Sequence, residues 1–438
     1  MAARYGRVAL GALIIALALA TRPGPAMAGD HAPPSRTGGG MIGDPAAADA
    51  LMQAVELTAT DTAVYDSFGW AVAVSKDGAT AVIGAPGILE NGTKRGAAYV
   101  FARSGTTWTQ QQKLIPGEGE PGDSFGFAVA LSADGTTAVI GAAAITLYEE
   151  IPATNAAYIF TRSGTAWTQR QKLTGGDTAH GDGFGYAVAI SGDGTTAAIG
   201  APAKNGGTGE AYVFARDGDR WAAPQGVTAS DAAGRDNFGG ALAMSGDGGT
   251  LVIGAGDKDG GVGAAYVFAR GGATWSERQE LVADDAAAKS YFGIAAAIST
   301  DGATAVVGAS GHAVGDYTPG AAYVFARSGD RWNQTQTLAP SDPRAGTTFG
   351  WAVAVSGAGD AAVIGQYGDA AYLFTRPDTS LIQWQQLADN APGSDNHFTH
   401  FGSAVAMSAD RTTVLIGAPT HGDLGAAFVF TSPALPGA

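Results

Sequence analysis

The chain repeats one pattern of bulky and small apolar residues, first seen in DSFGWAVAVSKDGATAVIGAP at residues 66–86. The pattern returns with drift at seven Phe-Gly pairs spaced 52 to 59 residues apart, which begin at Phe68, Phe125, Phe184, Phe238, Phe292, Phe349 and Phe401. A period of this size indicates one supersecondary unit copied along the chain, whose copies bury their apolar faces by packing on one another. The sequence therefore predicts one closed array rather than several independent domains.

Each copy reads as a series of short strands. In FGWAVAVS the bulky Phe68, Trp70 and Val72 share one face, while Gly and Ala occupy the other. A strand that is apolar on both faces predicts burial on both, so we place this strand innermost. An Asp-Gly turn such as SKDGAT joins it to a second strand, TAVIGAP, and the third strand, AYVFAR, is rich in β-branched and aromatic residues.

The fourth strand of each copy runs from Trp to Leu or Val. It is expected at residues 108–114, 167–173, 221–227, 275–281 and 332–338, and at 381–387 with Leu381 in place of Trp. Only six fourth strands follow their own copies, but LMQAVEL at residues 51–57 precedes the first pair and matches LIQWQQL at 381–387. We therefore predict an all-β, seven-bladed β-propeller of four-stranded antiparallel blades, closed by an N-terminal strand that completes the last blade.

These residues resemble the FG-GAP repeat family, whose best-known member is the β-propeller of integrin alpha subunits. Phe68-Gly69 and Gly84-Ala85-Pro86 match the two halves of the family's name, and the second half recurs at Gly200 to Pro202 and Gly417 to Pro419. The resemblance spans residues 51–431, is closest to the bacterial exported type, and implies a β-propeller with a role in adhesion. Integrin calcium loops carry alternating acids, whereas the first hairpins here are shortened, so that calcium role does not carry over.

Composition narrows the class of protein. Hydrophobic residues make up 45% of the chain and charged residues 15%, with 67 Gly, which suits short strands joined by tight turns. The formal net charge of -15 opposes binding to nucleic acid and to anionic lipid. Because the chain has no Cys, disulfides and thiolate metal sites are excluded, and stability has to come from packing.

The N-terminus is typical of a secretory signal peptide. A basic start precedes the apolar run Val8 to Ala20, and Ala26-Met27-Ala28 offers small residues for cleavage. We expect a signal peptide at residues 1–28, a flexible leader at 29–50, the propeller at 51–431 and a short tail at 432–438. The mature chain is then a monomer without a membrane span, located in the periplasm, at the cell surface or outside the cell.

Candidate site residues lie where strand direction brings together the GAP loops and the segments that lead into each Phe-Gly pair. Four acids precede the pairs at Asp66, Asp123, Asp182 and Asp236. They are interpreted either as a ring that binds a cation or polar ligand, or as caps that accept backbone N–H bonds within turns.

Metal candidates are sparse. Asp257 and Asp259 form half of a calcium loop, which leaves calcium open as a cofactor, and His397 and His400 form an H-x-x-H pair without a third firm ligand. For both pairs the alternative interpretation is a solvated loop that binds no metal.

The sequence contains no recognisable catalytic motif. We expect an exported, non-enzymatic interaction module that binds a protein or glycan through its loop face. A lectin or carbohydrate-active enzyme that uses the propeller channel is the alternative.

Overall fold

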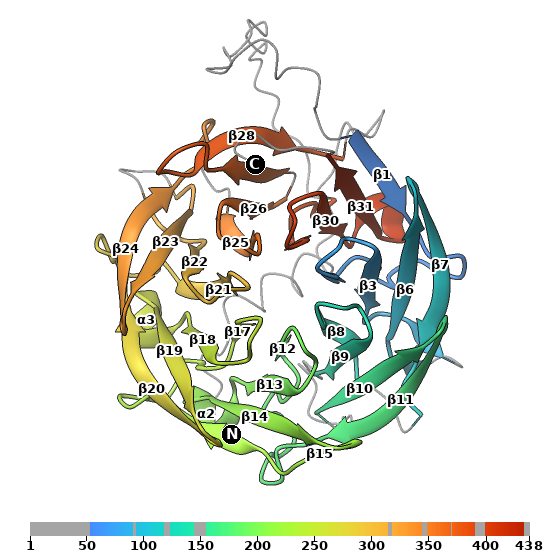
Figure 1. Cartoon of the computed structure of the whole chain (residues 1–438), viewed down its shortest axis with the longest axis horizontal. Coiled ribbons are helices and arrows are strands. Elements are labelled where there is room, and N and C mark those ends of the chain that lie inside the picture. The colour runs from blue at the N-terminus through green and yellow to red at the C-terminus, as the bar shows by residue number, and fades with distance from the viewer. Residues whose placement is uncertain are drawn as a thin grey trace, which may run out of the picture. The chain divides into compact units, whose positions relative to one another are not determined.

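The computed structural model describes residues 53–90, 93–117, 123–143, 155–313, 318–343, 348–368, 370–389 and 399–432. Seven antiparallel sheets surround a common centre; in six of them the strands run in sequence order from inside to outside, and in the seventh the first strand of the chain is outermost (Figure 1). The fold is thus the predicted seven-bladed β-propeller. The predicted signal peptide and leader, Leu51, and the tail after Ser432 lie outside the described residues.

The blades are numbered by their Phe-Gly pairs. Blade 1 contains β2 (Ala71–Val74), β3 (Thr80–Ala85), β6 (Ala97–Ser104) and β7 (Thr107–Leu114), and a small ribbon of β4 (Leu89–Glu90) and β5 (Thr93–Lys94) follows β3. Blade 2 contains β8 (Phe125–Leu131), β9 (Thr137–Ala142), β10 (Ala156–Ser163) and β11 (Ala166–Leu173). Blade 3 contains β12 (Val188–Ile190), β13 (Thr196–Ala201), β14 (Glu210–Asp217), β15 (Arg220–Trp221) and β16 (Gln225–Val227).

Blade 4 contains β17 (Ala241–Met244), β18 (Thr250–Ala255), β19 (Ala264–Gly271) and β20 (Thr274–Leu281). Blade 5 contains β21 (Phe292–Ile298), β22 (Thr304–Ala309), β23 (Ala321–Ser328) and β24 (Arg331–Leu338). Blade 6 contains β25 (Thr348–Val355), β26 (Ala361–Tyr367), β27 (Ala370–Thr375) and β28 (Ile382–Leu387). Blade 7 contains β29 (Ala404–Met407), β30 (Thr413–Ala418), β31 (Ala426–Thr431) and β1 (Gln53–Leu57).

Ring closure by the N-terminal strand is confirmed. β1 pairs antiparallel with β31, with Leu57 opposite Ala427 and Val55 opposite Val429. Leu57 is buried and packs with Phe68 in the core between blades 7 and 1. The first and last parts of the propeller are therefore joined by strand pairing, which leaves no open sheet edge at the seam.

Full burial of the innermost strands was a wrong expectation. All residues of β2 are half-buried, whereas all residues of β3 are buried. The innermost strands border the centre of the ring, where no further strand covers them (Figure 1). The second strand, which has a neighbouring strand on each side and a neighbouring blade on each face, forms the driest layer.

Glycines of neighbouring blades meet across every blade interface. A Cβ atom added to Gly84 of the GAP segment would lie 2.0 Å from the carbonyl oxygen of Gly126, the Phe-Gly glycine of the next blade. The same distance is 1.9 to 2.1 Å at Gly141, Gly200, Gly254, Gly308, Gly365 and Gly417. Because no side chain fits at such distances, glycine at these positions allows the backbones of adjacent blades to come into direct contact at the GAP segments.

Seven backbone hydrogen bonds close a second ring at the opposite end of the innermost strands. The N–H of Lys76 donates to the carbonyl of Ala133 in the next blade, and the last bond, from Ala409 to Lys76, returns to the start. The chain of donors and acceptors runs Lys76, Ala133, Gly192, Gly246, Thr300, Gly357 and Ala409, with distances of 2.9 to 3.1 Å. All seven blades therefore have equivalent positions around the centre.

Glutamine side chains connect the outer strands. The amide of Gln112 accepts from the Trp167 N–H and donates to the Trp167 carbonyl in the next blade. Equivalent clamps of 2.6 to 3.1 Å join Gln171 to Trp221, Gln225 to Trp275, Gln279 to Trp332 and Gln336 to Leu381. At the seam the register places Val55, which is 41% exposed, at the position of Gln112, and an aliphatic side chain makes no such clamp to Trp108.

Two expectations about the fourth strands need correction. The strand expected at residues 221–227 is interrupted, because Pro224 lacks an N–H and Ala222–Pro224 separate β15 from β16. The other outer strands of blades 1, 2, 4, 5 and 6 contain a bulge, but β1 pairs with β31 in straight register. The match of residues 51–57 to 381–387 in length is therefore not a match in register.

We expect Gly84→Ala to destabilise the propeller by about 3 kcal/mol or more, because the new methyl group would overlap the Gly126 carbonyl. Gly271→Ala is the matched control, since nothing lies within 4 Å of a Cβ atom there, and we expect a change within about 0.5 kcal/mol. Thermal and denaturant unfolding of both variants would measure the difference. Equal stability of the two variants would contradict the interface described here.

We expect Val55→Gln to stabilise the propeller by about 1 kcal/mol, because it supplies the two hydrogen bonds that Trp108 lacks. Val55→Asn is the control, since its shorter amide stops short of the next blade. Denaturant unfolding should separate the two variants. No gain from Gln, or the same gain from Asn, would show that the clamp adds nothing at this seam.

Candidate functional site

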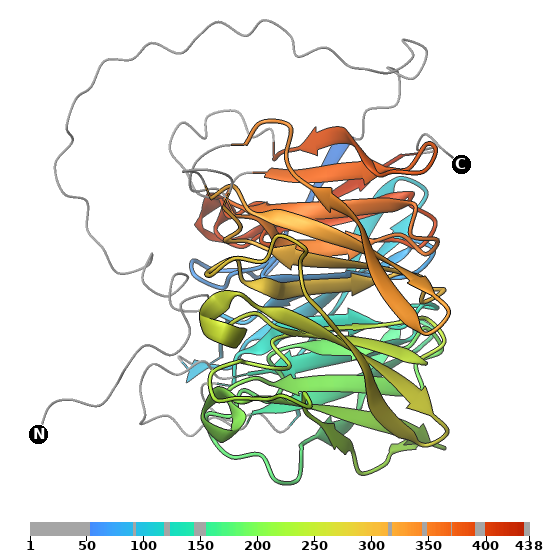
Figure 2. The same ribbon diagram turned by 90° about the vertical axis from the view of Figure 1, so that its left-hand side faces the viewer.

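The FG/GAP face is defined here as the linkers that lead into each Phe-Gly pair together with the loops after the second strands. It includes two helical turns, α2 (Lys204–Gly207) and α3 (Lys258–Gly261), and the 3-10 turn η2 (His421–Asp423). In Figure 2 the two yellow-green helical turns lie at one edge of the propeller, and the tips of the hairpins lie at the other. Backbone bonds join linkers to loops on this face, as from Tyr65 to Asp423.

A carboxylate in each of several linkers is fixed by the third strand and GAP loop of the next blade. Asp231 accepts a 2.7 Å hydrogen bond from the Tyr266 hydroxyl and lies 2.6 Å from Lys258 Nζ. The same arrangement joins Asp177 to Tyr212 and Lys204 and Asp285 to Tyr323 and His312, whereas Asp61 bonds to Tyr99 and to Lys113 of the fourth strand β7. The linkers are thus held rigidly against the sheets.

These clusters change the acidity of their members. The Lys258 ammonium lowers the pKa of Asp231, and the Lys204 ammonium does the same for Asp177. Burial and the Asp231 carboxylate raise the pKa of Tyr266. Burial alone would lower the pKa of Lys258, but its hydrogen bond to Asp231 and the negative charges of Asp231, Glu280 and Asp259 together outweigh that effect and raise it. The Asp231 and Asp177 clusters are therefore charged pairs, each with a neutral tyrosine at neutral pH.

The sequence interpretation missed these clusters, although it contains a signal for them. An Asp stands seven residues before the Phe of five pairs, at Asp61, Asp177, Asp231, Asp285 and Asp342. The cations Lys204, Lys258 and His312 likewise recur at one position of the GAP loop. The pairing between them depends on contacts 27 residues apart, as between Asp177 and Lys204, which a search for motifs within one segment does not detect.

The four predicted acids lie in separate linkers. Asp66, Asp182 and Asp236 each accept a hydrogen bond of 2.6 to 2.8 Å from the N–H three residues earlier. Asp66 and Asp236 are buried, and Asp123 is fully buried. Burial raises the pKa of Asp236. This geometry is that of turn caps, and the carboxylates do not converge on a common ligand position.

An arc of aromatic side chains lies where the innermost strands begin. The residue after each of the first three Phe-Gly pairs is Trp70, Phe127 and Tyr186. The rings of Trp70 and Phe127 are 5.5 Å apart, and those of Phe127 and Tyr186 are 5.2 Å apart. All three residues are half-buried, and their equivalents Gly240 and Ser403 are small. We call these three residues the aromatic arc.

A second aromatic group lies at blades 6 and 7. Trp351, the equivalent of Trp70, is 5.1 Å from the Tyr367 ring, and Tyr367 stacks on His400 at 4.4 Å. Burial raises the pKa of Tyr367 to about 12 and lowers the pKa of His400. His400 Nδ1 is 3.1 Å from the Thr420 hydroxyl. Both groups leave aromatic surface at the FG/GAP end of the centre.

The predicted metal candidates are placed apart. Asp257 bonds to the Asn237 amide at 2.5 Å, and the side chain of Asp259 is 74% exposed. His400 belongs to the aromatic stack, and His397 lies outside the described residues. Within the described ranges, no three His, Asp or Glu side chains converge as ligands for a metal ion.

The arrangement defines a class of protein, a β-propeller interaction module. The FG-GAP repeat family model matches six segments, at residues 51–101, 108–160, 167–214, 221–268, 275–325 and 332–375. The chain belongs to the FG-GAP repeat family. No curated protein matches it. None of the helices in the described part of the chain is long and apolar enough to cross a membrane.

We expect the imidazole of His400 to titrate below its ordinary pKa of 6.5, because burial disfavours its charged form. The folded chain then binds fewer protons than the unfolded chain as pH falls below 6.5, so this group's contribution to stability is lost on acidification. NMR titration of the imidazole checks the direction. In His400→Asn the melting temperature should fall less between about pH 7 and 5, and a midpoint above 6.5 would contradict the assignment.

Proposed function

We propose that the chain is an exported, non-enzymatic interaction module that binds a basic polypeptide on its FG/GAP face. The aromatic arc is the observation that supports this proposal best, because it leaves half-buried aromatic surface at the centre of a rigid face. Export is supported by the signal sequence at residues 1–28, and FG-GAP repeats are typical of extracellular proteins.

The charge of the linkers supports a basic partner. The described linkers contain two basic residues, Arg235 and Lys289, and eleven acids, Asp61, Asp66, Asp123, Asp177, Asp182, Asp231, Asp236, Asp284, Asp285, Asp342 and Asp389. Lysines pair with three of these acids, Asp61, Asp177 and Asp231, so acids remain in excess. Such a face attracts cations over roughly 10 Å at moderate ionic strength.

The aromatic arc suits the same partner. Arginine and lysine side chains bind aromatic faces through cation–π attraction, which strengthens where the site is partly desolvated. Trp70 and Phe127 would receive such a side chain at the centre of the FG/GAP face. The acids of the linkers would hold neighbouring basic residues of the same partner.

A glycan is the second candidate partner, since an aromatic ring also stacks on the apolar face of a sugar. It needs no positive charge, so its binding should respond little to salt. This difference separates the two candidates experimentally.

The test uses the secreted protein and a short arginine-rich peptide, compared with the same peptide in which citrulline replaces arginine. We expect the arginine peptide alone to bind, and to bind less tightly when salt is raised from about 0.05 M to 0.3 M. The double variant Trp70→Ser and Phe127→Ser should weaken binding about tenfold or more. Serine is chosen because Ser403 occupies this position in blade 7.

The control is Tyr65→Ser, which removes a side chain that is 71% exposed on the same face but outside the arc. It should bind like the parent protein. Equal binding of the citrulline peptide, or equal loss in Tyr65→Ser, would overturn the proposal. A positive glycan array without arginine binding would replace it with the glycan function.

A further inference from the structure

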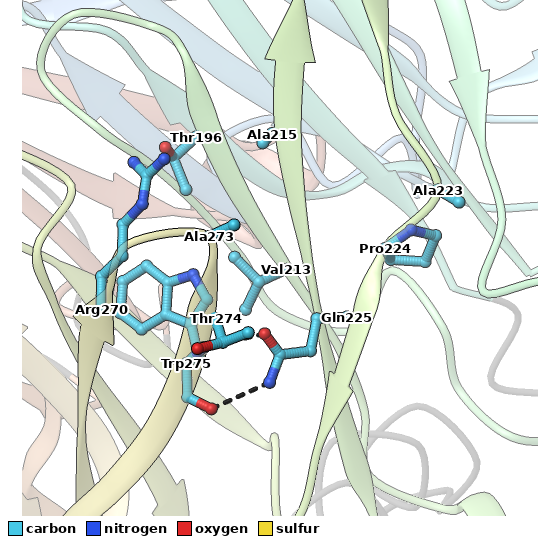
Figure 3. Close-up of a pocket in the computed structure, with 10 residues that line it drawn as sticks. All are labelled: Thr196, Val213, Ala215, Ala223, Pro224, Gln225, Arg270, Ala273, Thr274 and Trp275. Carbon is cyan, nitrogen blue, oxygen red and sulfur yellow. Dashed lines mark hydrogen bonds between the residues drawn. The ribbon is translucent and has the colours of Figure 1, made fainter.

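A cavity of about 410 Å³ that opens to solvent lies between blades 3 and 4 (Figure 3). Pro224 and Gln225 line it from blade 3, and Arg270, Thr274 and Trp275 line it from blade 4. The hairpin between β19 and β20 supplies the blade 4 wall, so the cavity is near the turn end of the strands, opposite the FG/GAP face. Its volume is typical of pockets that hold small molecules.

The outer strand of blade 3, which borders the cavity, differs in sequence from the outer strands of the other blades. In five other outer strands an unpaired bulge residue follows the Trp or Leu position by three, and these residues are Gln111, Arg170, Arg278, Thr335 and Trp384. In blade 6 the bulged Trp384 packs against the core of the next blade. Blade 3 has Pro224 at this position, preceded by Ala222 and Ala223. Pro224 lines the cavity, whereas at the same position Gln111, Arg170, Arg278 and Thr335 are exposed and only Trp384 packs inward.

The walls of the cavity are held in place. Gln225 is fixed by its two 2.8 Å bonds to the backbone of Trp275. Arg270 Nε donates to the Gly272 carbonyl at 2.9 Å, which orients the guanidinium. In Figure 3 Arg270 and Trp275 lie on one side of the hollow, and Ala223, Pro224 and Gln225 lie on the other. Among the described residues, Arg270 has no carboxylate within ion-pair distance, unlike Arg216, whose Nη2 lies 3.8 Å from Asp219.

The cavity is lined mostly by apolar side chains, together with one cationic side chain, Arg270. Val213, Ala215, Ala223, Pro224 and Ala273 supply the apolar surface, with the indole of Trp275. The hydroxyls of Thr196 and Thr274 and the amide of Gln225 supply polar groups. The terminal nitrogens of a guanidinium form paired hydrogen bonds to a carboxylate, and a neutral amide cannot reproduce that charge.

We propose that this cavity is a binding site for a small carboxylate with an apolar body. The carboxylate pairs with Arg270, and the body lies against Pro224 and Trp275. The site is independent of the FG/GAP face, so it stands whether or not a polypeptide binds there.

The test compares 3-phenylpropionate and heptanoate with their neutral amides, using calorimetry or ligand-observed NMR on the full mature protein. We expect the carboxylates to bind and the amides to bind about tenfold more weakly or not at all. Pro224→Trp places in blade 3 the bulge residue of blade 6, which packs against the next blade, and should abolish binding by filling the cavity. Arg270→Gln should weaken carboxylate binding about tenfold or more and leave amide binding unchanged.

Arg327→Gln is the matched control, because Arg327 Nε makes the same 2.9 Å bond, to Gly329, beside the boundary of blades 4 and 5, where blade 4 has Arg278 at the position of Pro224. It should bind both carboxylates like the parent protein. Melting temperatures of all variants would show that they are folded. The proposal is overturned if neither carboxylate binds at about 10 mM, if Pro224→Trp binds as well as the parent, or if both arginine variants lose binding equally.

Discussion

The propeller depends on direct backbone contact between neighbouring blades at two glycines. The glycine of each GAP segment lies against the carbonyl of the Phe-Gly glycine in the next blade, as Gly84 does against Gly126. The buried phenylalanine beside it anchors the same segment through ring contacts, such as those of Phe68 with Tyr99 and Phe101. The two residues of the Phe-Gly pair therefore have complementary roles. The phenylalanine fills the core, and the glycine allows neighbouring blades to approach each other.

Positions that the repeat holds constant build the ring, and positions that vary surround it. The residue after the Phe-Gly pair ranges from Trp70 to Gly240 without changing the blade, and the bulge residue of the outer strand ranges from Trp384 to Thr335. Both sets of positions lie on the innermost or outermost strands of the blades, outside the fully buried layer that the second strands form. A propeller of this kind can therefore acquire new surfaces without altering the contacts that close it.

The sequence predicts most of this fold because one unit is repeated with regular strand and turn signals. Counting outer strands was enough to place β1 beside β31. The split of β15 from β16 was also readable, since Pro224 stands inside the expected strand. The bulges, the linker clusters such as Asp231 with Lys258 and Tyr266, and the aromatic arc were not predicted. They depend on register and on contacts between blades, which strand periodicity does not specify.

The boundary between blade 7, where Val55 lies, and blade 1 determines how the ring responds to a pulling force. Bonds that close a circle bear an outward load in series, so the circle yields at its weakest link rather than at the average one. Among the described residues, five blade boundaries add a glutamine clamp to their shared contacts, and Val55 makes no such clamp at its boundary. A pulling force on the propeller would thus open it at the junction where the chain's beginning meets its end, and the remaining blades would come away as one intact arc.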